Sequence, residues 1–334
     1  MLEIFLATLN PMLMLFLCIV IGFVLKKANL LPENAGKVMA KLEVWVFCPA
    51  LSFVAMSKYF TVSALGTHFT NLLISVISVS IALIISIFLS RFFVKEKVYE
   101  RGVYQYALAF ANSGFVGDPV VLALFGFEGL AYYKIICLPL SIVIYTWGIS
   151  VLVPKSEKQG SLLKNLINAP MIAMLIGMIA GLTGLGNVLY STENFLSNTL
   201  TNLSSCMGPV AMLLAGFTIG SYSVKKMLTK TKVYFATALR LVFIPAFILT
   251  VLYLLKELVN LTFGLYIDNT ALFLLFFAIA GPLGLNTVVF PEAYGGDPST
   301  GASMAMISHT LCVITIPLMY ALLTVFLGTP PVFA

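Results

Sequence analysis

Two segments rich in glycine and containing proline carry the residues best suited to bind a ligand. The first runs from Asn112 to Pro119 (NSGFVGDP) and the second from Ala280 to Asn286 (AGPLGLN). Pro119 removes a backbone donor and disfavours the helical conformation of the preceding residue, while the glycines permit unwinding. A helix that restarts after such a break presents free N–H groups and a partial positive charge. Both segments therefore predict a site for an anion such as a carboxylate.

Three isolated titratable residues accompany these segments: Asp118, Arg240 and His309. An acid near the bilayer centre costs about 2.5–3.5 kcal/mol on insertion scales, so Asp118 needs compensation. It could cap a helix that has Pro119 at its first position, or it could bind a coupling proton or sodium ion. Arg240 could bind the anion, pair with Asp118, or extend to the cytoplasmic face. His309 could be a hydrogen-bonded core histidine or a proton relay.

The predicted site thus divides into substrate-binding and ion-coupling residues. The substrate-binding candidates are Asn112, Ser113, Gly114, Gly117, Pro119, Gly281, Pro282, Gly284, Asn286, Thr287 and Arg240. The coupling candidates are Asp118 and His309, with a sodium ion near Asp118 as the alternative to a proton. We expect no other cofactor.

The composition requires that a membrane surround these segments. Of the 334 residues 60% are hydrophobic and only 10% are charged, whereas soluble proteins carry roughly a quarter charged residues. Residues 72–90, for example, contain no charge, glycine or proline over about the length of one membrane span. Hydropathy and helix breakers predict ten spans, near residues 9–25, 38–57, 69–91, 102–125, 130–153, 166–185, 199–221, 233–255, 270–291 and 302–326.

The distribution of basic residues predicts the orientation in the membrane. Most of the 19 lysines and arginines lie in or beside four odd-numbered connections, at residues 26–41, 91–101, 155–164 and 225–232. The even-numbered connections hold only Lys58, Lys134 and Lys256. The positive-inside rule then places the odd connections in the cytoplasm and both termini outside. No basic patch interleaved with aromatic residues is present, so we expect membrane lipid and no nucleic acid as a partner.

A repeated pattern indicates two related halves. The motif FAxxGxxGxxxV begins at Phe110 and again at Phe277, and weaker echoes relate prolines in the corresponding spans. The predicted halves are residues 1–154 and 155–334, with five spans each. An odd number of spans per half forces the halves to be inverted, as in many secondary transporters.

At these residues the sequence resembles the auxin efflux carrier family, which includes the plant PIN proteins and bacterial dicarboxylate carriers. The matching segments are residues 110–119, 208–216 (GPVAMLLAG) and 286–297 (NTVVFPEAYGGD). The resemblance implies ten helices in two inverted repeats with helices 4 and 9 broken and crossing, as in bile-acid/sodium symporter-like proteins. It also implies a homodimeric scaffold of helices 1, 2, 6 and 7, and an elevator-type transport domain of helices 3–5 and 8–10. Plant members carry a second asparagine where this chain has Val120.

The prediction is an all-α, multi-pass protein of the bacterial plasma membrane that transports a small organic anion by alternating access. A malate- or malonate-like dicarboxylate is the expected substrate class. The alternatives are a monovalent cation/proton antiporter of similar fold and an exporter of an auxin-like aromatic carboxylate. An antiporter usually has two acids at the crossover, whereas Leu285 stands at the position matching Asp118. We expect no enzymatic activity, because the spans lack paired acids and a Ser/His constellation.

Overall fold

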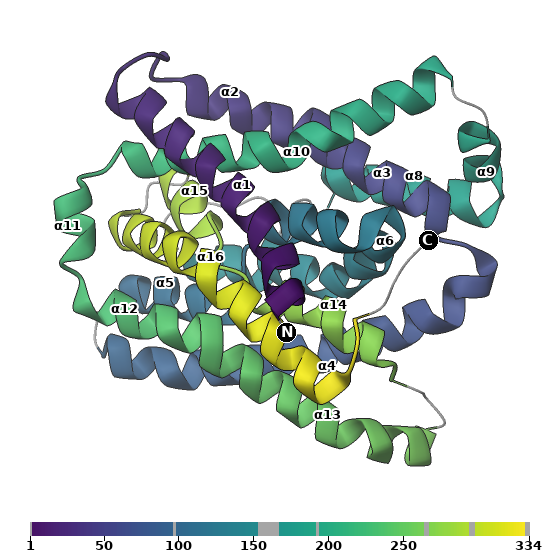
Figure 1. Ribbon diagram of the computed structural model, residues 1–334. Helices are drawn as coiled ribbons and strands as arrows, with labels where there is room; N and C mark the ends of the chain where they lie inside the picture. The colour runs from purple at the N-terminus through teal and green to yellow at the C-terminus, as the bar shows by residue number, and fades with distance from the viewer. Residues whose placement is uncertain are drawn as a thin grey trace.

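The computed structural model describes residues 2–95, 98–152, 167–191, 194–263, 267–293 and 298–330, and these residues are almost entirely helical (Figure 1). The described part contains no strand, only one isolated pair of bridged residues. The predicted boundary between the halves at 154/155 and the connection 155–164 lie outside the described residues.

Seven helical stretches in the described residues are long and apolar enough to cross a membrane, which makes the chain a multi-pass membrane protein. They are α1 (Leu2–Lys27), α2 with α3 (Ala35–Leu42 and Cys48–Tyr59), α4 (Leu65–Phe93), α6 with α7 (Asp118–Val143 and Ile149–Leu152), α10 (Phe195–Gly220), α12 with α13 (Thr231–Ala238 and Ile244–Phe263) and α16 (Ser299–Leu327).

The stretch from Ser113 to Leu152 is too long for a single crossing, since it contains 40 residues. It changes direction at Gly126, whose φ of 64° lies in the left-handed region that favours glycine. The bend brings the residues after Gly126 back alongside those before it. Two predicted spans, 102–125 and 130–153, therefore meet at this glycine without a loop between them.

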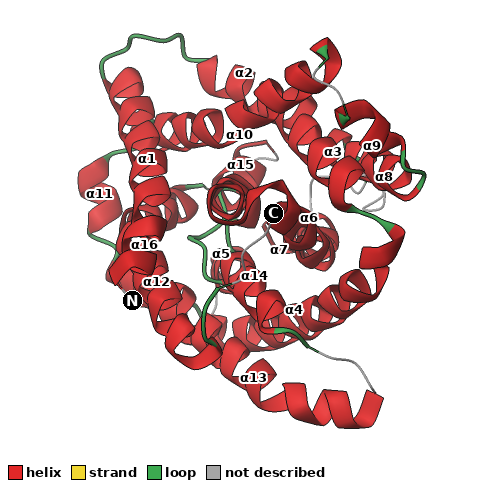
Figure 2. Cartoon of the chain, turned by 45° about the vertical axis from the view of Figure 1, so that its right-hand side comes forward, coloured by secondary structure: helices red, strands yellow, loops and turns green. Residues whose placement is uncertain are grey.

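Three shorter helices are also present: α5 (Val98–Ala109), α8 (Ala169–Leu182) and α14 (Asn269–Ile279). All residues of α14 from Ala271 onwards are buried, and the helix lies in the interior of the chain's helical bundle (Figure 2). A helix that is apolar on every side is suited to such a position. Both α5 and α14 are short because the chain unwinds immediately after them.

Two pairs of helices pack closely against each other. Helix α1 lies against α10, and α3 lies against α8 (Figures 1 and 2). A Cβ atom on Gly22 would lie 2.1 Å from the carbonyl oxygen of Leu213, and one on Gly216 would lie 1.9 Å from that of Ile19. Small residues permit this backbone approach, which is how helices associate inside membranes.

Candidate functional site

The first glycine-rich segment interrupts a helix. Helix α5 ends at Ala109, residues 110–112 are non-helical, and a wide π turn (η3, Ser113–Gly117) then leads into α6. Asn112 caps the restarted helix: its Oδ1 accepts a hydrogen bond from the N–H of Phe115 at 3.4 Å. The first two N–H groups, those of Ser113 and Gly114, have no acceptor within the helix.

The interpretation of Asp118 as the helix cap was wrong. Its backbone angles (φ −53°, ψ −54°) continue a helix that begins more than one turn earlier. Asn112 is also a favourable capping residue, and its backbone angles (φ −78°, ψ 61°) are non-helical beside the bridge between Ala111 and Leu283. Pro119 follows the π turn of η3. The wider turn makes room for the proline ring, which would clash with the preceding turn of a regular α-helix.

The second segment interrupts the chain between α14 and α15 (Asn286–Ala293), leaving residues 280–285 non-helical. Hydrogen bonds from neighbouring side chains support the unwound backbone. The hydroxyl of Ser308 on α16 accepts from the N–H of Leu283 at 3.1 Å, and Thr287 donates to the carbonyl of Gly284 at 2.9 Å. Irregular backbone at membrane depth requires such internal partners.

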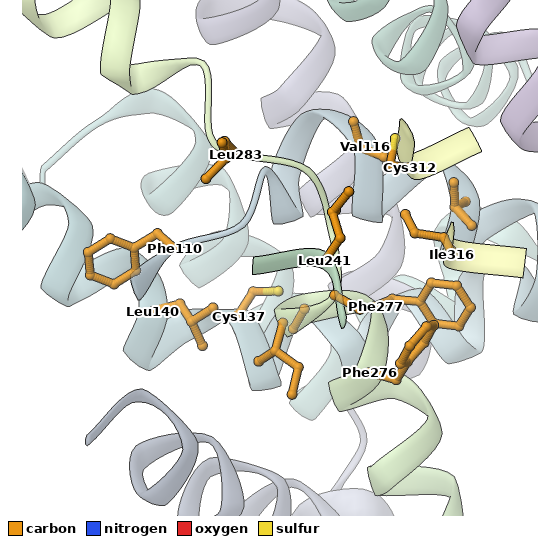
Figure 3. Close-up of a cluster of buried hydrophobic side chains, with 14 of the residues drawn as sticks. Phe110, Val116, Cys137, Leu140, Leu241, Phe276, Phe277, Leu283, Cys312 and Ile316 are labelled. Carbon is orange, nitrogen blue, oxygen red and sulfur yellow. The ribbon is translucent and has the colours of Figure 1, made fainter. Parts of the chain in front are cut away.

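The two unwound segments cross in contact. Ala111 and Leu283 form an antiparallel bridge, and the N–H of Asn112 donates to the carbonyl of Pro282 at 2.7 Å. Figure 3 shows Leu283 on the segment that passes over the chain leaving Phe110. A Cβ on Gly281 would lie 3.2 Å from that of Ala111, so a residue without a side chain suits this crossing.

The hydroxyl of Tyr133 links the two chain segments that meet at the crossing. It lies 2.9 Å from the carbonyl of Ser113 and 3.4 Å from that of Phe277, near the end of α14. A Cβ on Gly117 would lie 1.9 Å from this hydroxyl, so the tyrosine can reach both carbonyls only because residue 117 is glycine.

Gly117→Ala is therefore expected to displace Tyr133 and loosen the crossing, with a stability loss of about 1–3 kcal/mol. Thermal unfolding in detergent measures it. Gly114→Ala is the matched control in the same motif, because a Cβ there would meet no atom within 4 Å. Equal melting temperatures for the two variants would contradict the assigned role of Gly117.

A cavity of about 170 Å³ lies between the crossing and helices α3 and α8. Six of the predicted site residues line it: Asn112, Ser113, Gly114, Asp118, Gly284 and Asn286. The other walls come from Cys48 and Ser52 of α3, from the start of α8, and from Lys134, Cys137 and Ser141 of α6.

The remaining predicted residues do not line the cavity. Gly117, Gly281 and Pro282 form the crossing itself. Pro119 is close enough to α10 that a Cβ on Gly208 would lie 2.7 Å from it. Thr287 bonds within its own turn.

The charged partner of Asp118 is Lys134, which sequence reasoning had counted at the edge of an external connection, at the start of the predicted span 130–153. The Lys134 ammonium contacts the Asp118 carboxylate, and both residues are buried, with 9% and 1% of their surface exposed. The bend at Gly126 brings them together, because it folds the second part of α6 back beside the first. A buried acid without a neutralising charge was the signal that could have prompted a search for a buried cation.

Arg240 does not extend to the surface and does not pair with Asp118. Only 1% of it is exposed, and its Nη1 donates to the carbonyl of Leu108 at 3.3 Å. That carbonyl belongs to the last turn of α5, where the helix dipole is negative. Arg240 therefore stabilises the end of the broken helix.

His309 of α16 contacts the crossing directly. Its Nδ1 lies 2.7 Å from the carbonyl of Ala305, and its Nε2 lies 3.1 Å from Nδ2 of Asn112. On the other side of the crossing, Asn286 donates its amide to the hydroxyl of Tyr106 at 2.8 Å. Both predicted asparagines are thus held by side chains on neighbouring helices.

Comparison with known proteins identifies the family of the chain. The sequence is 25% identical over 314 residues to an uncharacterized transporter of Methanocaldococcus jannaschii, covering 93% of this chain and 97% of that protein. The profile of the family described as "Membrane transport protein" matches residues 7–162 and 158–320. The chain therefore belongs to this membrane transport protein family, the auxin efflux carriers.

Proposed function

We propose that the protein is a secondary active transporter of a small organic anion, a carboxylate of the malate or malonate class. The observation that carries the proposal is the cavity at the crossing, lined by two unwound segments and by the buried Lys134. Broken helices at corresponding places in a membrane protein are the common setting of a transport site. At about 170 Å³ the cavity is smaller than the roughly 300 Å³ or more of pockets for drug-sized ligands.

In this proposal the anion is held by one full charge and two backbone donors. The Lys134 ammonium has further donors beyond the one that contacts Asp118. The N–H groups of Ser113 and Gly114 begin the restarted helix, and Gly114 is exposed to the cavity. A carboxylate accepting from these groups would make charge-assisted hydrogen bonds. This assigns to Lys134 the role first predicted for Arg240.

We further propose the ten-helix, inverted-repeat architecture of elevator type. Helices 1 and 7 correspond to α1 and α10, and helices 2 and 6 to α3 and α8. An inverted repeat relates helix 1 to helix 6 and helix 2 to helix 7. The contact of helix 1 with helix 7 (α1 with α10) then corresponds to the contact of helix 6 with helix 2 (α8 with α3). These four helices would form the scaffold and the homodimer contact, and the cavity lies between α3 and α8 and the remaining helices.

With the predicted orientation, we propose that this conformation presents the cavity to the cytoplasm. Asn168 and Pro170 line the cavity at the start of α8, which follows the lysine-containing connection 155–164. In an alternating-access cycle the transport helices would then move relative to the scaffold and present the cavity to the other side.

A cation/proton antiporter is the second candidate, and the buried Asp118–Lys134 pair is the observation that favours it. In that cycle a sodium ion would replace the Lys134 ammonium at the Asp118 carboxylate. The ion pair occupies the place predicted for sodium, so binding of the cation would require Lys134 to move or lose its proton.

Uptake into proteoliposomes separates the two candidates. Labelled mono- and dicarboxylates are offered with pH and sodium gradients imposed separately. The proposal predicts accumulation of a small carboxylate; movement of sodium and protons without any carboxylate would favour the antiporter. No carboxylate uptake and no exchange under any gradient would contradict the proposed function.

The topology can be tested independently of substrate. Single cysteines in place of Lys226 of α11 (Val224–Leu228) and of Leu185 of α9 (Leu185–Tyr190) occupy exposed positions. Positive-inside bias predicts that a membrane-impermeant thiol reagent reaches position 185 from outside and position 226 only after the membrane is opened. A reporter fused to the C-terminus should be external. A cytoplasmic C-terminus would contradict the inverted-repeat arrangement.

A further inference from the structure

The hydrogen bonds of His309 match a neutral ring with its hydrogen on Nδ1. The carbonyl of Ala305 can only accept, so Nδ1 must carry the hydrogen. In the neutral ring Nε2 is then an acceptor, and it receives the amide N–H of Asn112. The same amide orientation directs Oδ1 of Asn112 to the N–H of Phe115. A neutral His309 and a capped helix at the cavity therefore belong to one hydrogen-bond arrangement.

Protonation of His309 would break this arrangement. With hydrogens on both ring nitrogens, Nε2 would face the donor amide of Asn112. The amide can satisfy the ring only by turning its oxygen toward it, and its nitrogen would then face the N–H of Phe115. The helix start would lose its cap and would gain a positive charge beside it. A bound anion corrects both defects, since it accepts the freed N–H and neutralises the charge.

Among the described residues, the elements packed against α16 offer His309 no other compensating charge. The elements packed against α16 include α1, α5, α10, α11, α12, α14, α15 and η6 (Leu239–Phe243). Among their described side chains the buried titratable groups are Tyr104 and Tyr106 of α5 and Arg240 of η6. The acids of these elements whose side chains are described, Glu3 and Glu100, are not buried. On α16 itself Cys312 donates to the carbonyl of His309.

We propose that His309 is the proton site of the transporter, and that the Asn112 amide couples its protonation to binding of the anion at the start of η3. The proposal rests on the proposed function. Binding of the proton raises the affinity for the anion, and binding of the anion raises the affinity for the proton by the same factor. Proton–anion symport follows, with the coupling at the crossing and not at Asp118, whose carboxylate is held by Lys134.

The test is the number of protons taken up when the anion binds. Titration calorimetry with malate at pH 7, in buffers of different ionisation enthalpy, should give about one proton per malate for the wild-type protein. His309→Gln offers an oxygen to Asn112 but cannot accept a proton, so it should bind malate with no proton uptake. His68→Gln is the control: His68 is the other histidine of the chain, is also buried, and stacks on Phe60 at 4.6 Å. It should behave as wild type.

Equal proton uptake by His309→Gln and the wild type would overturn this inference alone. Absence of binding by the wild type to malate and to every carboxylate of the uptake panel would overturn the proposed function and this inference with it. If His309→Gln does not fold, nitrogen NMR of the wild-type protein labelled at its two histidines decides. The His309 signal should change from the neutral to the protonated form when malate is added, with His68 unchanged; a His309 that stays neutral overturns the inference.

Discussion

Lys134→Met is expected to abolish carboxylate binding and to destabilise the protein by about 3–5 kcal/mol. The stability loss arises because the substitution leaves the Asp118 carboxylate buried without its partner. The binding loss has two causes: the site loses its ammonium, and the remaining carboxylate repels the anion in surroundings of low dielectric. Thermal unfolding in detergent and equilibrium binding of a labelled carboxylate measure the two effects.

The variant Asp118→Asn/Lys134→Met separates stability from binding. It removes both charges, so it should regain most of the lost stability while still binding the carboxylate at least about tenfold more weakly than wild type. Lys41→Met is the control for loss of a lysine; Lys41 is exposed on α2, away from the cavity, and its replacement should change neither property. Binding by the neutral double variant as tight as wild type would show that Lys134 does not hold the anion.

Asn112→Ala is expected to weaken carboxylate binding at least about tenfold. The start of η3, whose Ser113 and Gly114 N–H groups hold the anion in this proposal, loses the side chain that ties it to His309 of α16. The substitution removes the cap of η3 and the donor to His309 in one step. Helix capping alone accounts for about 0.5–2 kcal/mol of stability. The measurement is equilibrium binding combined with thermal unfolding.

Asn168→Ala provides the matched comparison. Asn168 also caps a helix at the cavity wall, accepting from the N–H of Met171 at 3.0 Å, but it belongs to the proposed scaffold. The two variants should lose similar stability, and only Asn112→Ala should lose most of its affinity. Similar affinities for the two would place the anion away from the start of η3.

The unwound segments were predictable because their cause is local. Gly281, Pro282 and Gly284 disfavour a continuous helix whatever surrounds them, and the chain does unwind at residues 280–285. The exact start of the restarted helix near Asp118 was not predictable. Asn112 and Asp118 are both good capping residues, and the bridge to Leu283 decides between them by keeping residues 110–112 out of the helix.

The Asp118–Lys134 pair was missed because it depends on tertiary structure. Hydropathy treated the residues around Gly126 as the end of a span and Lys134 as the edge of a connection, whereas the chain bends sharply at the glycine and continues as helix. The direction in which Arg240 points could not be read either, since it lies within an apolar run with no periodic polar face. The direction of the Arg240 side chain becomes clear only from its hydrogen bond to the carbonyl of Leu108.

The most direct test of carboxylate binding at the crossing is substrate protection of a thiol inside the cavity. Gly114→Cys, in a background without the five native cysteines, places the thiol where the backbone is open to the cavity; Gly66→Cys is an exposed control on α4. A transported carboxylate should slow labelling at position 114, with a concentration dependence that matches its transport affinity, and should leave position 66 unaffected. Labelling at position 114 that is equally fast with and without a saturating transported carboxylate would contradict the account.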